Sequence, residues 1–106
     1  MPDFERGNEN NRNEQVAVGT TTVKVCNMLP IGVRRVLVIT NLSAIAQTIT
    51  LNVGGAAIAG QGIPLLVGSS YQETVSENFE PTNQEVWAIS TAATGKLAVY
   101  ERLLVV

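Results

Sequence analysis

Histidine is absent from the 106-residue sequence, and cysteine occurs once, at Cys26. Without histidine the commonest general base is missing, and neither a Cys–His nucleophile nor a zinc site of clustered Cys and His can form. A single cysteine also excludes an intrachain disulfide. Because it ends an apolar strand, we expect Cys26 to be an inert, partly buried thiol. The sequence therefore predicts a protein that is not an enzyme and that holds no metal and no cofactor.

Charged residues are also scarce, at 15% of the chain, against about 25% in an average soluble domain. Residues 1–15 hold four acidic and two basic side chains, whereas residues 16–106 hold five of each. A body without a basic stripe is poorly suited to follow a phosphate backbone, and a neutral body lacks the self-repulsion that opposes association. We therefore expect self-association and no nucleic-acid partner.

Long apolar runs are missing too. No run approaches the ~18 apolar residues of a membrane-spanning helix. The first residues lack the basic and apolar regions of a signal peptide. We therefore expect no membrane partner and synthesis in the cytoplasm.

The pattern that is present is strand alternation, most clearly over residues 48–53, where polar and apolar residues alternate. The Gly54-Gly55 pair that follows indicates a tight turn and a short return strand. Apolar residues of both parities at 36–39 indicate a strand covered on both faces. Trp87 alternates with Ile89, which favours burial of the indole in the core. The strand segments lie at 16–26, 33–40, 45–53, 71–75, 85–91 and 96–106.

These short strands with turns between them predict an all-β fold. We expect an antiparallel β-sandwich of about 7–8 short strands, of the jelly-roll or Greek-key type, over residues 16–106. Residues 1–15 are too polar to fold alone and predict an extended N-terminal arm. We expect this arm to dock on a neighbouring chain, with folding back onto its own domain as the alternative.

Carboxylate pairs are the remaining candidates for chemistry, namely Glu77 with Glu80 and Glu73 with Glu101. Two carboxylates serve a glycosidase and can also bind calcium. The simpler interpretation is a solvated acidic surface. The glycines of residues 54–62 are not followed by Lys-Ser/Thr or by a helix, so they predict turns and not a phosphate loop.

The runs 49–55, 62–65, 68–71, 86–90 and 95–101 together resemble small β-sandwich virion proteins of tailed bacteriophages. These are head decoration (cement) proteins and related minor capsid proteins. The resemblance implies a structural protein, often a homotrimer, that binds the outer capsid and bridges major capsid subunits. It implies location on the virion surface after assembly in the host cytoplasm, and it carries no catalytic residues.

The arm and two apolar strands are the expected contacts with the capsid or a sister subunit. The candidate contact residues are Phe4, Arg6, Arg12, Arg34, Arg35, Leu103 and Leu104. A carbohydrate-binding or adhesin-like module is the alternative function, with Tyr71 or Trp87 as the platform. A small hydrolase that uses Glu77 or Glu80 is a further alternative.

Overall fold

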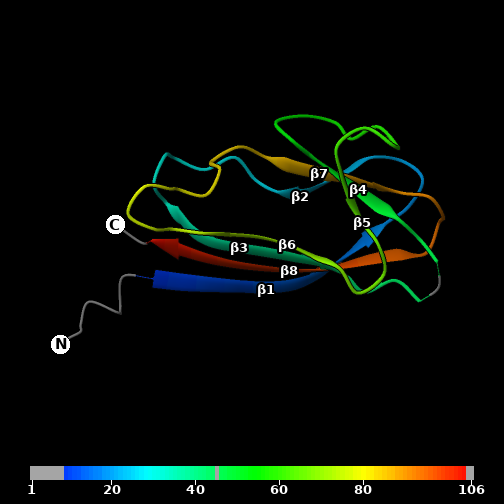
Figure 1. Ribbon diagram of the computed structural model, residues 1–106, viewed down its shortest axis with the longest axis horizontal. Helices are drawn as coiled ribbons and strands as arrows, with labels where there is room; N and C mark the ends of the chain where they lie inside the picture. The colour runs from blue at the N-terminus through cyan, green and yellow to red at the C-terminus, as the bar shows by residue number, and fades with distance from the viewer. Residues whose placement is uncertain (1–8, 45, 105–106) are drawn as a thin grey trace.

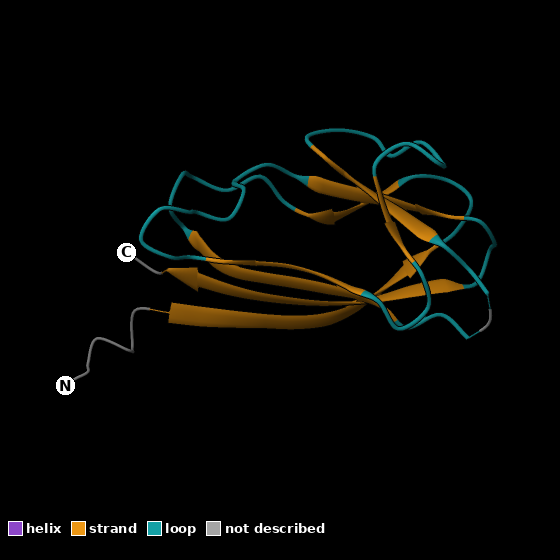
Figure 2. Ribbon diagram, viewed as in Figure 1, coloured by secondary structure: helices purple, strands orange, loops and turns teal. Residues whose placement is uncertain are grey.

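The computed structural model describes residues 9–44 and 46–104, and these form eight β-strands and no helix (Figures 1 and 2). Accordingly, no helix in the described residues is long and apolar enough to cross a membrane. The strands are β1 (Glu9–Val18), β2 (Val23–Cys26), β3 (Arg34–Asn41), β4 (Ile49–Val53), β5 (Ile63–Leu65), β6 (Ser70–Thr74), β7 (Val86–Ser90) and β8 (Gly95–Leu104).

The strands form two four-stranded antiparallel sheets that pack face to face. The long sheet has the order β1-β8-β3-β6, and the short sheet has the order β2-β7-β4-β5. Successive strands cross from one sheet to the other, except that β4 and β5 are neighbours in the short sheet. This is the strand order of a jelly roll, so the predicted fold class is confirmed.

The hydrophobic core lies between the two sheets. Successive side chains of a strand point to opposite faces, and the apolar residues of one parity therefore turn inward. The fully buried side chains from the long sheet are Val18, Leu37, Ile39 and Leu97, and those from the short sheet are Ile49, Leu51, Val86 and Ala88.

Strand β1 begins earlier than the sequence predicts, because sequence analysis assigns residues 1–15 to the arm. The strand starts at Glu9 and pairs with β8 over all ten of its residues without a register shift. It lacks the usual apolar alternation because Arg12 and Glu14 occupy inward positions. The sandwich therefore starts at residue 9, and residues 1–8 of the predicted arm lie outside the described residues.

Trp87 and Ile89 are not core residues, and the prediction of core burial was wrong. Both side chains are half-buried on the outward face of β7, whereas its inward positions hold Val86, Ala88 and Ser90. The indole Nε1 donates a hydrogen bond to Glu85 Oε1 at 2.6 Å. Alternation over five residues does not show whether the odd-numbered or the even-numbered side chains face the core. In β7 the smaller, even-numbered side chains face the core.

The turn at Gly54-Gly55 is not the predicted tight hairpin. Residues 54–62 form a loop between β4 and β5, with a single bridge between Ile58 and Gln61 in place of a return strand. Gly54 and Gly62 both have positive φ, at 102° and 141°, which glycine adopts without steric cost. The interpretation of these glycines as turn residues is thus consistent with the backbone.

Gly62 also lies against the backbone of β4, and substitution there should destabilise the fold. A Cβ at Gly62 would overlap the Leu51 carbonyl oxygen and lie 3.2 Å from Thr50 Cγ2. We expect Gly62→Ala to lower the free energy of unfolding by about 1–3 kcal/mol, the usual effect of overpacking. Urea unfolding measures it. Gly55→Ala is the control, because its Cβ would meet nothing within 4 Å. Equal midpoints for the two variants would contradict this interpretation.

Candidate functional site

A cluster of charged side chains replaces apolar packing at one end of the sandwich, where β1 begins and β8 ends. Glu101 of β8 is 3% exposed and lies between two arginines. Its Oε1 accepts a hydrogen bond from Arg12 Nη1 at 2.7 Å, and its Oε2 accepts one from Arg34 Nε at 2.7 Å. Both carboxylate oxygens are therefore engaged, and the cluster links β1, β8 and β3.

Arg34 fastens two loops to the sandwich. Its Nη1 donates to the carbonyl oxygens of Thr82 and Gln84 at 2.5 and 3.1 Å, and its Nη2 donates to that of Asn27 at 2.9 Å. The side chain has no exposed surface. Arg34 is thus an internal brace, and its predicted role in contact with another chain is corrected, since that role requires an exposed side chain.

Arg12 anchors β1 to the rest of the sandwich and is a quarter exposed. Its Nη2 donates to Glu14 Oε1 and to the Val25 carbonyl oxygen, both at 2.8 Å. Burial alone lowers the pKa of Arg12, but the hydrogen bonds to Glu14 and Glu101 and the attraction of Glu101 outweigh burial and raise it. Arg12 therefore stays charged, and the predicted contact residue is largely committed to its own subunit.

Cys26 is buried beside this cluster, with its Sγ 3.9 Å from Arg12 Nη1. Burial, and secondarily the negative charge of Glu101, raise the pKa of Cys26 from 9.0 to about 11. Because the thiolate is the nucleophile, the thiol should be unreactive, as predicted from the sequence.

We expect Cys26 to react with iodoacetamide at pH 8 roughly 100-fold more slowly in the folded protein than in urea, since two pKa units change the thiolate fraction by that factor. The raised pKa also means that the stability contributed by the neutral thiol is present below pH 9 and is lost as the pH rises through about 11. Mass spectrometry of alkylated protein measures the rate. Comparable rates with and without urea would contradict the buried thiol.

Glu73 and Glu101, the first carboxylate pair considered for catalysis, are occupied by hydrogen bonds within the protein. Glu73 accepts hydrogen bonds from the Tyr71 hydroxyl and from the Thr82 backbone N–H. Burial, followed by the bond to Glu73, raises the pKa of Tyr71 to about 12. Leu37 of β3 pairs with Glu73 of β6 on one side and with Glu101 of β8 on the other. Each of the two carboxylates accepts two hydrogen bonds from donors within the protein. Glu73 and Glu101 therefore act as structural acceptors.

The second carboxylate pair is exposed. Glu77 and Glu80 lie in the loop between β6 and β7, which contains a single bridge between Ser76 and Phe79. Within the described residues, no group of three or more His, Cys, Asp or Glu side chains is placed to hold a metal ion. The arrangement favours the solvated surface over a catalytic or calcium site.

The other predicted contact residues occupy mixed positions. Arg35 is half-buried at a register shift of β3, and its Nη1 donates to the Gly32 carbonyl oxygen at 3.4 Å. Leu103 and Leu104 are half-buried at the end of β8. Phe4 and Arg6 lie outside the described residues. Of the five described contact residues, the structure brings Arg12 and Arg34 together on Glu101 and places Leu103 opposite Arg34 in the register.

Two loops at this end expose apolar side chains that sequence analysis did not select. We call residues 27–33 and 75–85 the arm-end loops, because they lie where β1 begins. They expose Ile31 at 80%, Met28 at 58% and Phe79 at 46%. The Leu29 N–H donates to the Asn83 carbonyl oxygen at 2.8 Å, which joins the two loops. The sequence feature that could have indicated this surface is the presence of apolar residues inside turn segments, where exposure to solvent favours polar residues.

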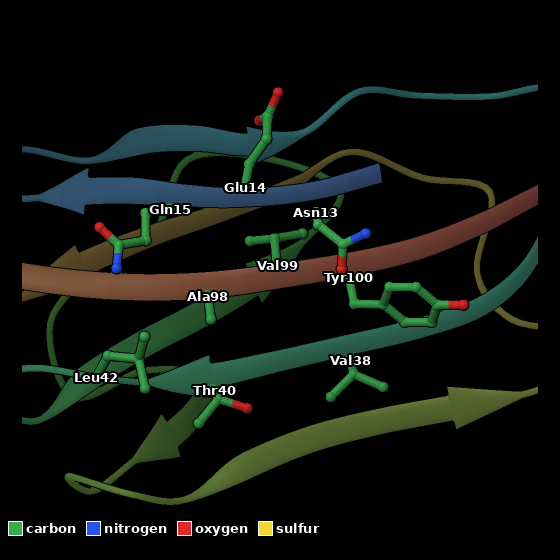
Figure 3. Close-up of a pocket in the computed structure, with 9 residues that line it drawn as sticks. All are labelled: Asn13, Glu14, Gln15, Val38, Thr40, Leu42, Ala98, Val99 and Tyr100. Atoms are coloured by element: carbon green, nitrogen blue, oxygen red, sulfur yellow. The ribbon is translucent and has the colours of Figure 1, made fainter. Parts of the chain in front are cut away.

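The outward face of the long sheet carries a shallow depression of about 360 Å³. Val38, Ala98 and Tyr100 form its apolar centre, and Asn13 and Gln15 of β1 line one side (Figure 3). Because this face is open, it suits contact with a flat surface better than enclosure of a small ligand.

Comparison of the chain with protein-family models, with curated proteins and with solved structures found no match.

Proposed function

We propose that this chain is a structural virion protein, a decoration or cement protein that binds the outer capsid shell and bridges major capsid subunits. The observation that carries the proposal is the pair of arm-end loops. They present Met28, Ile31 and Phe79 to solvent at the end of the sandwich where the chain enters β1. Contiguous exposed apolar patches mark interaction surfaces, and the bond from the Leu29 N–H to the Asn83 carbonyl oxygen holds the two loops next to each other.

The buried cluster supports this role because it makes the loops rigid before binding. Arg34 holds the backbone of both loops through Asn27, Thr82 and Gln84. A loop that is already ordered loses less conformational freedom on binding and so binds more tightly. The charged cluster therefore serves the contact surface indirectly, and residues 1–8 would add further contacts to the shell.

Cosedimentation with phage heads tests the proposal. Purified chain is mixed with heads of the encoding phage from which the protein has been stripped. We expect the double variant Ile31→Ser/Phe79→Ser to lose at least tenfold in affinity, because both anchors become polar. Leu66→Ser/Val67→Ser is the matched control, since these residues are 63% and 44% exposed in the loop between β5 and β6. Unchanged binding by the first variant would contradict the assigned surface.

A carbohydrate-binding or adhesin-like module is the second candidate, favoured by the outward position of Trp87. Aromatic rings that are accessible on a sheet face are typical platforms for sugars. A glycan array tests this candidate: binding that Trp87→Ala abolishes would favour it over the capsid role.

A further inference from the structure

The outer edge of β1 is an open strand edge. β1 is the terminal strand of the long sheet, and among the described residues only β8 pairs with it (Figure 1). Natural proteins protect such edges with short strands, proline or bulges. β1 has ten residues, no proline, no glycine and no register shift. This edge is therefore suited to pair with another strand.

The backbone groups that point to this edge follow from the register of the sheet. The Leu42 N–H donates to the Lys96 carbonyl oxygen, and the Leu104 N–H donates to that of Val33. Even-numbered residues of β8 therefore bond toward β3. Alternate residues of an antiparallel strand bond to opposite sides, so odd-numbered residues of β8 bond toward β1.

The odd residues of β8 pair in register with the even residues of β1. The even residues of β1 thus use their N–H and C=O groups within the subunit. The odd residues Asn11, Asn13, Gln15 and Ala17 direct theirs to the open edge. An added antiparallel strand would satisfy these groups without disturbing any bond inside the subunit.

Charge selects the partner and the register. Arg12 and Glu14 are the charged residues at inward positions in the middle of β1, two residues apart and on the same face. If a second copy of β1 pairs antiparallel about a twofold axis at Asn13, Arg12 of each copy faces Glu14 of the other. A shift of the axis to residue 12 would oppose the two arginines, and a shift to residue 14 would oppose the two glutamates. Opposite charges in facing positions stabilise a strand pair and like charges destabilise it.

We propose that two copies of this chain associate through β1, antiparallel about a twofold axis at Asn13, so that their long sheets join into one continuous sheet. The same register places Asn11 opposite Gln15 of the second copy on the outward face, where their amides can exchange hydrogen bonds. Inward charges usually protect an edge, but here they are complementary. Glu14, with its side chain 54% exposed, is accessible for this contact.

Molar mass measured by light scattering on the purified full chain tests the association, independently of any capsid. We expect twice the 11.3 kDa chain mass. Asn13→Pro should give the mass of one chain, because proline lacks the N–H that points to the open edge. The substitution leaves the hydrogen bonds between β1 and β8 intact. An unchanged circular dichroism spectrum shows that the variant folds. If Asn13→Pro unfolds, the cysteine variants below still decide.

Gln72→Pro is the matched control for this variant. β6 is the other terminal strand of the long sheet, and the Val75 N–H donates to the Arg35 carbonyl oxygen. Odd residues of β6 therefore bond to β3, and Gln72 points its N–H to solvent, as Asn13 does. We expect Gln72→Pro to remain dimeric. A monomeric wild type, a trimer, or loss of association in both proline variants would overturn the proposal.

Cysteine substitution tests the register. The two copies of residue 13 would face each other with Cα atoms about 5.5 Å apart, within the range of a disulfide. The two copies of residue 11 would be offset by four residues, or roughly 13 Å. We therefore expect Asn13→Cys to form an interchain disulfide on mild oxidation and Asn11→Cys to form none. Cys26 is buried and does not compete. Crosslinking of Asn11→Cys alone, or of neither variant, would contradict this register, and a partner strand of another protein would leave both uncrosslinked.

Discussion

Glu101→Gln is expected to lower the free energy of unfolding by about 3–5 kcal/mol, the effect of removing one partner from a buried ion pair. The substitution keeps the size of the side chain but removes the charge that faces Arg12 and Arg34. Arg34 has no exposed surface and Glu101 has 4% of its side chain exposed, so water cannot replace the lost counter-charge. Urea unfolding, followed by tryptophan fluorescence, measures the change.

Lys24→Gln is the control for this experiment. Lys24 lies 3.9 Å from Glu85, and its side chain is 41% exposed. Exposed ion pairs contribute about 0–1 kcal/mol, so this variant should unfold almost as the wild type does. Two variants that differ by less than about 1 kcal/mol would mean that the Glu101 cluster is not a central structural element, since a buried pair is expected to exceed that value.

Deletion of residues 2–15 is expected to abolish cooperative unfolding, whereas deletion of residues 2–8 should preserve it. The longer deletion removes most of β1 and takes Arg12 away from Glu101 and from the Val25 carbonyl oxygen. It also opens the edge of β8 from Ala98 to Leu104, where the inward residue Val99 belongs to the core. Thermal unfolding followed by circular dichroism distinguishes the two shortened chains.

The deletions also separate folding from binding. If residues 1–8 alone form the arm, their deletion leaves a folded dimer that binds phage heads less tightly. A folded, stable product of the 2–15 deletion would contradict the assignment of residues 9–15 to the sandwich. Full binding by the 2–8 deletion would show that the arm-end loops suffice.

The fold class could be predicted because its signal is local. Alternation in β4 follows from the period of a strand, and Leu51 of that strand is buried. The strand order could not be predicted, because β1 pairs with β8 across almost the whole chain. Such long-range pairing leaves no periodic trace in the sequence.

The candidate surfaces were harder to predict than the fold. The sequence assigns residues 9–15 of β1 to an arm because Arg12 and Glu14 occupy positions where a core strand usually carries apolar residues. The sequence predicts a surface contact at Arg34, because an arginine in an apolar strand does not reveal that Glu101, 67 positions away, neutralises it. Both errors have one cause, since a buried ion cluster has the composition of a surface.

The two proposed surfaces use different parts of the jelly roll. The edge of β1 would join two copies through odd-numbered backbone groups, while the arm-end loops would contact the shell through Met28, Ile31 and Phe79. Arg12 of β1 and Arg34, which holds the arm-end loops, both donate hydrogen bonds to Glu101, so this carboxylate links the two surfaces. A variant that removes Glu101 should therefore weaken both contacts, whereas Asn13→Pro should affect only the first.

The proposed role as a component of a virion is tested most directly by quantitative mass spectrometry of purified particles. Particles of the encoding phage are purified on a density gradient, and peptides of this chain are counted against those of the major capsid protein. We predict a fixed ratio across the particle peak. Absence of the chain from the particles, or a ratio that varies through the peak, would contradict the claim.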